Sequence, residues 1–222
     1  MRSAFEDNGY AIVRNFLGQA ELHALSQCCE PIADQYGLRN LLTRVPQING
    51  LLLNDRLAEL MGALGYAAAK PVRSLFFNKN LAHNWLVPWH QDLSIAVSAK
   101  AEATGYAKWT YKDGVDYVEP PVEILESIIT LRVALDDADE NNGALKVIPG
   151  SHLLGKLPSG DIPALVKDRA HVSCSVQAGD LLVMKPLLLH SSSKAANPVS
   201  RKVIHIELSA ASLPPLMTWG EQ

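Results

Sequence analysis

The sequence predicts a mainly β fold with flanking helices, in the form of an antiparallel sandwich or jelly roll. Three observations indicate this class: a helical first third, a series of short β-rich runs after residue 70, and turn residues between those runs. The chain has 222 residues, 48% of them hydrophobic, which is enough to bury a sizeable core. We expect a single domain over residues 1–222.

The helical part, residues 1–70, rests on two amphipathic segments and is expected to pack on the β part. Residues 19–36 carry apolar side chains at three- and four-residue intervals, and residues 54–64 repeat this pattern. Asn54 is a suitable N-cap for the second helix, and Gly65 ends it.

The β part, residues 71–210, consists of short runs that are rich in β-branched and apolar residues. We place strands near residues 72–79, 87–97, 127–136, 144–148, 171–176, 180–185, 187–193 and 202–209. Two turn signals, Asn141-Asn142-Gly143 and Ala178-Gly179-Asp180, separate some of these strands.

Residues 98–126 show neither a helical nor a strand period, although they contain several tyrosine and tryptophan residues. A segment of this length inside a compact domain is usually a lid, a binding loop or a disordered stretch. The aromatic content favours order, so we interpret the segment as a lid. Its Trp109 and Tyr111, with Trp85 and Trp89 nearer the centre of the chain, are candidates for a substrate pocket or for the core.

The composition excludes several classes of protein. A net charge of −3 offers no basic footprint, so we expect no nucleic-acid partner. No apolar run approaches the ~20 residues that cross a bilayer, and acidic residues interrupt the N-terminal segment where a signal peptide is apolar. The three cysteines, with no regular spacing, indicate free thiols in a reducing compartment. We therefore expect a cytoplasmic protein without a membrane partner; its oligomeric state is unknown.

The stretch PWHQDLSIAV places a histidine and an aspartate on an expected strand. Residues i and i+2 of a strand share a face, so His90 and Asp92 are expected to point to one spot. A hydrogen-bonded pair at a strand edge is one interpretation. The other is a divalent metal site, because two histidines and one carboxylate are the ligand set of non-haem Fe(II) oxygenases.

His190 is the strongest candidate for the second histidine. It ends the apolar run LLVMKPLLLH, three serines follow it, and Arg201 heads another strand eleven residues later. Four other histidines lie on an expected helix, in a loop, in a turn and at a strand start: His23, His83, His152 and His171.

Taken together, the segments FEDNGYAIVRNFL, WHQD, VALDDADENNGALKVIPGSH and GDLLVMKPLLLHSSS, followed by Arg201, resemble the phytanoyl-CoA dioxygenase family over nearly the whole chain. This family belongs to the Fe(II)- and 2-oxoglutarate-dependent oxygenases. The resemblance implies a double-stranded β-helix, the cupin-like form of a jelly roll. It also implies Fe(II) as metal, with 2-oxoglutarate and O2 as co-substrates.

The resemblance also implies roles for individual residues. His90, Asp92 and His190 match the metal ligands. Arg201 matches the arginine that binds the distal carboxylate of 2-oxoglutarate. Three further residues match positions around the co-substrate: Ser192, Lys79 and Arg132. Some relatives have an aromatic residue at the position of Arg132. Asp92 excludes the halogenase variant, in which a small residue replaces this carboxylate.

The strand that begins at Arg201 alternates between two kinds of face. Arg201, His205 and Glu207 share a polar face, and apolar residues occupy the other face. The strand around Arg132 alternates in the same way. Strand pattern alone is compatible with a polar face in water or with one that lines a barrel mouth. The metal motif favours the barrel mouth, with His205 and Glu207 lining the site or orienting its ligands.

We therefore expect a dioxygenase that hydroxylates, or otherwise oxidises, a small organic molecule and releases succinate and CO2. A non-catalytic, cupin-like protein that binds metal for sensing or structure is the alternative from another class, and a protein side-chain hydroxylase is a third. The acidic run 136–140 lacks the Asp-x-Asp-x-Asp-Gly pattern of a calcium loop, so we expect a solvated turn there.

Overall fold

The computed structural model describes residues 1–35, 37–196 and 200–221, and its strands form three antiparallel sheets. The largest has the order β1-β11-β8-β13-β3-β2 and consists of Tyr10–Val13, Leu181–Met184, Ile129–Ala134, Arg201–Ser209, Lys70–Lys79 and Gly37–Arg39. The second has the order β10-β9-β12-β4 and consists of Val172–Cys174, Leu145–Val147, His190–Ser192 and Val87–His90. The third has the order β5-β7-β6 and consists of Ile95–Val97, Val115–Glu119 and Ala107–Lys112.

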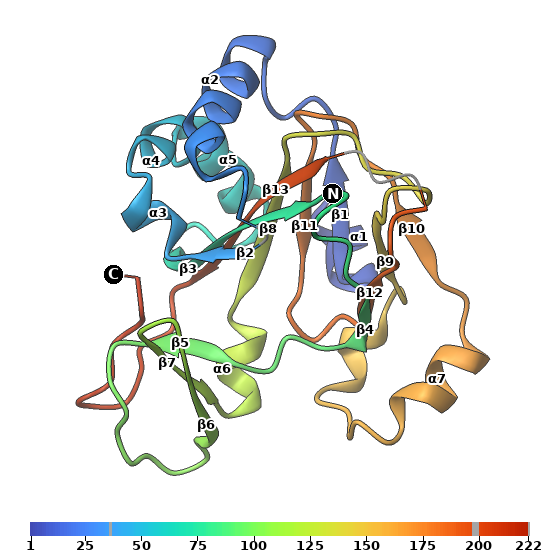
Figure 1. Ribbon diagram of the computed structural model, residues 1–222. Helices are drawn as coiled ribbons and strands as arrows, with labels where there is room; N and C mark the ends of the chain where they lie inside the picture. Colours follow the sequence, from blue (N-terminus) through green and yellow to red (C-terminus); the bar gives the residue numbers. More distant parts are fainter. Residues whose placement is uncertain (36, 197–199, 222) are drawn as a thin grey trace.

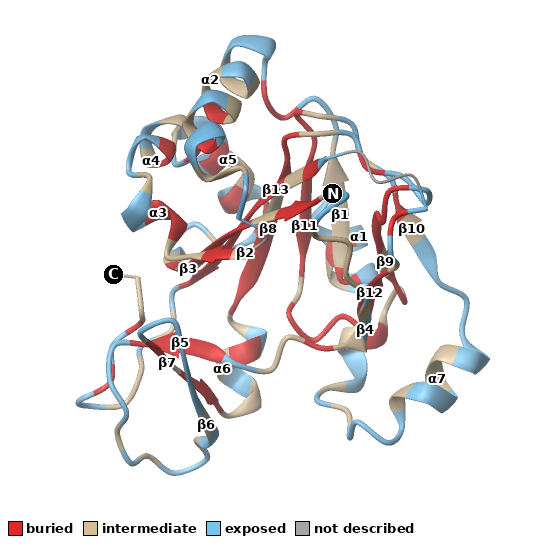
Figure 2. Cartoon of the chain, in the orientation of Figure 1, coloured by how far each residue is buried: buried red, intermediate tan, exposed pale blue. Residues whose placement is uncertain are grey.

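The helices between residues 2 and 64 cover one face of the six-stranded sheet, and the four-stranded sheet lies on its other side (Figure 1). The helices are α1 (Arg2–Asn8), α2 (Gln19–Cys29), α3 (Leu41–Arg44), α4 (Gln47–Leu52), α5 (Asp55–Leu64), α6 (Val122–Glu126) and α7 (Ile162–Asp168), with 3-10 turns at Glu30–Ile32 and Ser151–Leu154. Figure 2 shows the buried residues concentrated on the strands, whereas β6 and α7 are largely exposed. The expected jelly roll with flanking helices is thus confirmed.

The main core lies between the helices and the apolar face of the six-stranded sheet. Ile204 and Ile206 of β13 are fully buried there, and Leu25 of α2 and Leu64 of α5 pack in the same cluster. Burial of each such side chain stabilises the fold by about 1.5–3 kcal/mol. This core takes up the apolar face of β13, so the polar face of the strand is directed to the inside of the jelly roll.

Both expected helices are present, with one boundary changed. The Asn54 side chain accepts a hydrogen bond from the Leu57 N–H at 3.2 Å, and Gly65 ends α5 with a φ of 93°. These features confirm the predicted caps. The helix expected over 19–36 ends at Cys29 and continues only as the 3-10 turn, and Tyr36 lies outside the described residues.

Two expected strands are corrected. The run 87–97 is not one strand: β4 ends at His90, and β5 begins at Ile95 and belongs to a different sheet. The run 187–193 narrows to His190–Ser192, because the residues before it form a turn. The sequence also missed several elements of three to seven residues, which are too short to show a period, among them β1, β2, α3, α4 and α7.

Residues 98–126, the expected lid, contain β6, β7 and α6. β7 pairs with β5, and apolar residues of the segment pack in a small core with Val72 and Leu187. Trp109 contacts this core, whereas the Tyr111 side chain is exposed. The segment is therefore a folded hairpin with its own core rather than an aperiodic loop, and its role as a lid stays a prediction.

Three other expectations concern the cysteines, the acidic run and membrane spans. The three cysteines are free, as predicted. The acidic run forms a turn, in which the Asp139 carboxylate accepts hydrogen bonds from the Asn141 and Asn142 N–H groups. Within the described residues, no helix is both long and apolar enough to cross a membrane.

Candidate active site

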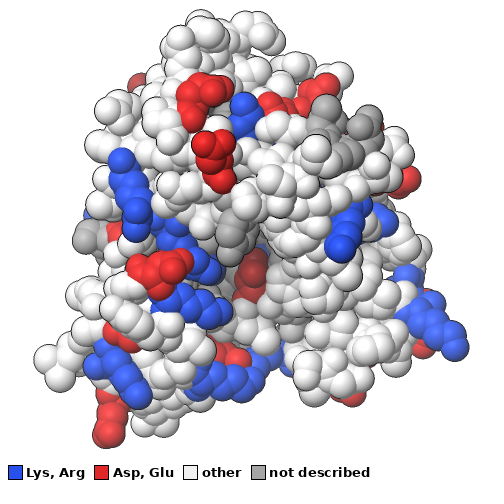
Figure 3. Space-filling model, in the orientation of Figure 1, with Lys and Arg blue, Asp and Glu red and all other residues white. Residues whose placement is uncertain are grey.

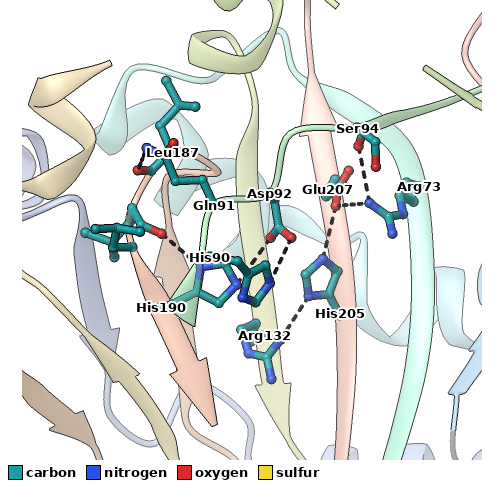
Figure 4. A network of polar contacts seen from close by, with 12 residues as sticks. Arg73, His90, Gln91, Asp92, Ser94, Arg132, Leu187, His190, His205 and Glu207 are labelled. Carbon is teal, nitrogen blue, oxygen red and sulfur yellow. Dashed lines mark hydrogen bonds and ion pairs between the residues drawn. The ribbon is translucent and has the colours of Figure 1, made fainter. Parts of the chain in front are cut away.

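Two strands of the four-stranded sheet place His90 and His190 side by side. His90 at the end of β4 pairs in register with His190 at the start of β12, and their ring centroids are 4.2 Å apart (Figure 4). The Nδ1–H of each ring donates to a backbone carbonyl two residues earlier, Pro88 or Leu188, at 2.8 Å. Each Nε2 lone pair is therefore directed away from its own strand.

Asp92 reaches the two rings from the loop after β4. Its backbone N–H donates to the Pro186 carbonyl at 2.9 Å. One carboxylate oxygen lies 3.7 Å from His90 Nε2 and the other lies 3.6 Å from His190 Nε2. The sequence placed Asp92 near His90 by strand alternation, and that reason is wrong, because the strand has already ended. The loop brings the carboxylate to the same point.

Burial and neighbouring charges set the protonation state of the three groups. Burial lowers the pKa of His190 to about 4, and the Asp92 charge offsets only part of this effect. Burial raises the pKa of Asp92, but His190, His90, His205 and Arg73 together lower it more, to about 2. At neutral pH the cluster contains a neutral His190 imidazole and an ionised carboxylate.

This donor set fits a divalent metal ion. His90, Asp92 and His190 each offer one donor atom, and these atoms lie within 4.8 Å of one another. Donors about 2.1 Å from a shared ion lie roughly 3–4 Å apart. The carbonyl partners of Nδ1 select the tautomer that presents Nε2, as in most metal-binding histidines. Three protein donors in a facial arrangement leave coordination positions open, as in non-haem Fe(II) oxygenases.

The far end of the same cavity is cationic. Arg201 and Lys79 face each other across β13 and β3, and both are almost fully buried. The Lys79 ammonium donates to the Ser192 hydroxyl and to the Ser193 carbonyl, both at 2.8 Å. In the described part of the chain, Arg201 Nε has no hydrogen-bond partner, and no carboxylate forms an ion pair with either residue.

Burial and the positive charges of neighbouring residues lower the pKa of both basic groups. Burial, followed by the charges of Arg201 and Arg132, lowers the pKa of Lys79 to about 8. Burial, followed by the charge of Arg132, lowers the pKa of Arg201 to about 9. A buried positive charge without a counter-ion is unfavourable. The residues therefore fit an anionic group at this end of the cavity.

Glycine at position 143 permits the close packing around Lys79. The Ser192 hydroxyl donates to the Gly143 carbonyl at 2.8 Å, and Gly143 has a φ of 82°. A Cβ atom at this position would lie 2.7 Å from the Ser193 carbonyl oxygen and 3.1 Å from Lys79 Nζ. The turn signal at Asn141-Asn142-Gly143 thus also serves the site, because any side chain there would displace the ammonium.

A chain of polar contacts runs along the polar face of β13. Arg132 donates to His205 Nδ1 at 3.1 Å, and His205 Nε2 lies 3.2 Å from the Glu207 carboxylate (Figure 4). Arg73 donates to the same carboxylate at 2.9 Å. The structure therefore directs this face into the jelly roll, where His205 and Glu207 orient the guanidinium of Arg132.

The cavity that joins these groups has a volume of about 110 Å³. It is lined by Arg73, Leu75, Phe77, Trp85, Val87, His90, Asp92, Arg132, Leu145, His190, Ser192, Arg201 and His205. Figure 3 shows a hollow near the centre of the same view of the molecule. The sequence analysis missed Arg73 and Phe77, although both alternate with Lys79 on one face of β3, and this period could have indicated them.

All seven residues singled out from the sequence thus come together around one cavity. Six of them line the cavity directly, and Lys79 forms a hydrogen bond with one of these six, Ser192. His152 is remote from the ligand cluster: its Nε2 bonds to the Glu6 carbonyl, and it lines a different cavity. Trp85 lines the metal cavity, whereas Trp89 lines a neighbouring one.

Inside this jelly roll a His-x-Asp pair and a distant histidine meet at one point, which is the ligand set found in non-haem Fe(II) oxygenases. Residues 5–203 match the model of the family Phytanoyl-CoA dioxygenase (PhyH). The chain belongs to this family, which confirms the resemblance seen in the sequence.

Two curated relatives align with this chain over only part of their own length. Phytanoyl-CoA dioxygenase 1 of Oryza sativa subsp. japonica is 33% identical over 102 residues, which are 41% of this chain and 34% of the relative. L-proline trans-4-hydroxylase of Streptomyces griseoviridis is 25% identical over 189 residues, which are 72% of this chain and 63% of the relative. The chain therefore spans less than two thirds of each of these proteins.

Solved structures share the fold. AviO1 from Streptomyces viridochromogenes superposes with a TM-score of 0.71 at 22% identity, over 96% of this chain and 95% of that one. EctD from S. alaskensis, solved with 2-oxoglutarate and 5-hydroxyectoine, gives 0.71 at 17% identity, over 94% and 74%. The epimerase SnoN, solved with Fe3+, alpha ketoglutarate and nogalamycin RO, gives 0.72 at 17% identity, over 97% and 89%.

Proposed function

We propose that this protein hydroxylates, or otherwise oxidises, a small organic molecule and converts 2-oxoglutarate to succinate and CO2. His90, Asp92 and His190 hold the iron, and Arg201 with Lys79 and Ser192 binds the distal carboxylate of 2-oxoglutarate. The relatives support a small substrate, because one is named for the hydroxylation of L-proline and two were solved with 5-hydroxyectoine or nogalamycin RO.

One observation carries the proposal. A single cavity has a two-histidine, one-carboxylate donor set at one end and, at the other, buried basic groups that pair with no described carboxylate. A metal alone would explain the first end. An anion that reaches from the metal to Arg201 explains both, and 2-oxoglutarate has a carboxylate at each end.

Each residue contributes a distinct physical effect. The guanidinium of Arg201 forms a planar fork that pairs two-to-two with a carboxylate, which an ammonium cannot do. Lys79 supplies a further donor beside it, and the Ser192 hydroxyl holds that ammonium in place. Arg132, held by His205, adds positive charge to the cavity that would hold the co-substrate. When bound, iron and 2-oxoglutarate supply the oxidising chemistry, and the chain binds, orients and shields them.

The experiment is an anaerobic titration of the metal-free protein with Fe(II) and then with 2-oxoglutarate, followed by visible absorption. We expect a weak metal-to-ligand band that is absent in His90→Ala. In Arg201→Ala, half-saturation should need at least about 100-fold more 2-oxoglutarate, in line with the loss of a bidentate charged pair. Arg201→Lys should recover only part of this affinity, and Arg44→Ala, an exposed change on α3, should behave as the unaltered protein.

A band that is unchanged in both the His90 and the Arg201 variants would reject the site assignment. Fe(II) binding without any response to 2-oxoglutarate would instead support the cupin-like metal-binding alternative. Succinate release above the uncoupled background then identifies the substrate. A response to folded proteins but to none of the small molecules would favour a side-chain hydroxylase.

A further inference from the structure

The metal cavity is too small for the co-substrate and a second molecule together. Its volume is about 110 Å³, whereas pockets for whole small molecules usually begin at about 300 Å³. A substrate that reacts beside the metal therefore needs adjoining space. This inference rests on the proposed function and concerns where the substrate lies and what chemical class it belongs to.

One neighbouring cavity meets this requirement. It has a volume of about 750 Å³ and shares His90 with the metal cavity. Three other cavities, of about 270, 550 and 400 Å³, have no lining residue in common with the metal cavity. The larger cavity lies between the end of β4 and a wall formed by residues 156–166, which includes the start of α7.

Gln91 attaches this wall to the metal-binding strands. Its side-chain amide donates to the Gly155 carbonyl at 2.8 Å and to the Leu187 carbonyl at 2.7 Å, and its oxygen accepts from the Leu157 N–H at 2.8 Å. Because Gln91 stands between His90 and Asp92, the wall is connected to the ligand pair by a buried, fully bonded side chain. The cavity is therefore held in a definite position next to the metal site.

The lining is apolar except at one side. The apolar part consists of ring and branched-chain surface from Trp89, Leu157, Pro158, Ile162 and Val166, and none of the described residues that line the cavity is acidic. Ile162 and Val166 are one helical turn apart, so they present one face of α7.

Two lysines, Lys108 and Lys156, also line this cavity. Both form ion pairs with the single carboxylate of Glu119, so this side retains one positive charge in excess.

We propose that this cavity binds the substrate, and that the substrate is an amphipathic acid with a bulky hydrophobic body, cyclic or branched, and one anionic group. The hydrophobic body lies against Trp89 and the Ile162–Val166 face of α7. The anionic group lies beside Lys156 and Lys108. The carbon that is oxidised extends past His90 towards the metal.

Two fluorescent probes that differ by one anionic group test the proposal: 1-anilinonaphthalene-8-sulfonate and N-phenyl-1-naphthylamine, which lacks the sulfonate. Both should bind the full chain. Ile162→Asp and Val166→Asp should weaken both probes at least tenfold, because each puts a carboxylate in the apolar surface. Both positions are partly exposed, so the variants should fold, which circular dichroism checks.

Lys156→Met separates the two parts of the proposal. It should weaken the sulfonated probe about three- to tenfold and leave the neutral probe unchanged. The matched control is Leu153→Asp, which places the same carboxylate at an exposed leucine that lines the cavity of about 270 Å³. This control should alter neither probe.

The assignment of the cavity would be overturned if neither probe binds, or if Leu153→Asp and Ile162→Asp weaken probe binding equally. Equal losses of both probes in Lys156→Met would overturn the anionic group. The Fe(II)–2-oxoglutarate absorption, recorded on the unaltered protein, separates this inference from the proposed function. If the absorption band appears but Ile162→Asp does not weaken probe binding, only the assignment of the cavity is rejected. If the band is absent but probe binding weakens as expected, only the oxygenase function is rejected.

Discussion

The two ends of the metal cavity differ in how the chain satisfies them. At the metal end each histidine has a backbone carbonyl as partner, and the carboxylate lies between two imidazoles. At the cationic end burial and neighbouring positive charges lower the pKa of Lys79 and of Arg201, and no described carboxylate forms an ion pair with either residue. At the metal end the protein supplies the hydrogen-bond partners of the histidines. At the cationic end no described residue supplies the negative charge that the basic groups would bind.

This difference shows where stability and function coincide and where they conflict. Hydrogen bonds to Nδ1 stabilise the fold and prepare a metal ligand at the same time. Buried, unpaired cations lower stability and are retained at a site where an incoming charge is bound strongly in a medium of low dielectric constant. Substitutions at the two ends should therefore have opposite effects on the stability of the metal-free protein.

The largest effect should follow from Asp92→Ala. Because this carboxylate is the only acidic donor of the described cluster, Fe(II) or Mn(II) affinity should fall by more than about 100-fold. Anaerobic calorimetry with Mn(II) measures the change. Asp168→Ala, at the exposed end of α7, serves as the control. Retained affinity in Asp92→Ala would place the metal elsewhere and remove the contrast between the two ends.

Arg201→Met should separate stability from binding at the cationic end. Removal of a buried, unpaired charge should raise the free energy of unfolding of the metal-free protein by about 1–3 kcal/mol, while 2-oxoglutarate binding is largely lost. Urea denaturation measures the first quantity, with Arg44→Met on α3 as the control. A lower free energy of unfolding in Arg201→Met would show that the chain itself pairs this guanidinium.

The pH dependence of 2-oxoglutarate binding should follow Lys79. With a pKa of about 8 in the folded protein, Lys79 is mostly cationic below pH 8 and neutral above it, so affinity should fall about tenfold as pH rises beyond 8. The unfolded-state pKa is higher, so this residue alone makes the free energy of unfolding rise with pH between about 8 and 10.5.

Lys79→Met is the test of this assignment. The variant should show weaker binding of 2-oxoglutarate at pH 7 and should lack the fall near pH 8, so that only the fall near pH 9 expected from Arg201 remains. Titrations at constant ionic strength give the profile. A profile in Lys79→Met that still falls at pH 8 would assign the effect to another group.

A smaller effect should follow from Gln91→Glu, which acts on the link between the two metal-binding strands. The new oxygen would face the Gly155 and Leu187 carbonyls, which accept hydrogen bonds from Gln91 in the native protein. Displacement of the adjacent ligands should weaken Mn(II) binding about tenfold, in the lower range for residues that orient metal ligands. Gln27→Glu on the exposed side of α2 is the control, and equal effects in the two variants would reject the positioning role.

Much of the fold could be predicted, because it depends on local pattern. Alternation placed Ile204 and Ile206 on an apolar face, and the helical period with the Asn54 cap placed α5. The break between β4 and β5 could not be predicted, because apolar residues continue on both sides of it. The hairpin of β6 and β7 was missed for a related reason, since most β6 side chains are exposed and carry no alternating apolar signal.

The sequence by itself indicated His90, Asp92 and His190 as candidate metal ligands, because two histidines and a carboxylate are a known donor set and the segments around them resemble those of the family. It also determined that the strand from Arg201 has one apolar and one polar face. Only the tertiary structure decided that this polar face looks inwards, that Asp92 approaches from a loop, and that Arg73 and Gln91 belong to the neighbourhood of the site. These facts depend on contacts between residues far apart in the chain, which no local period encodes.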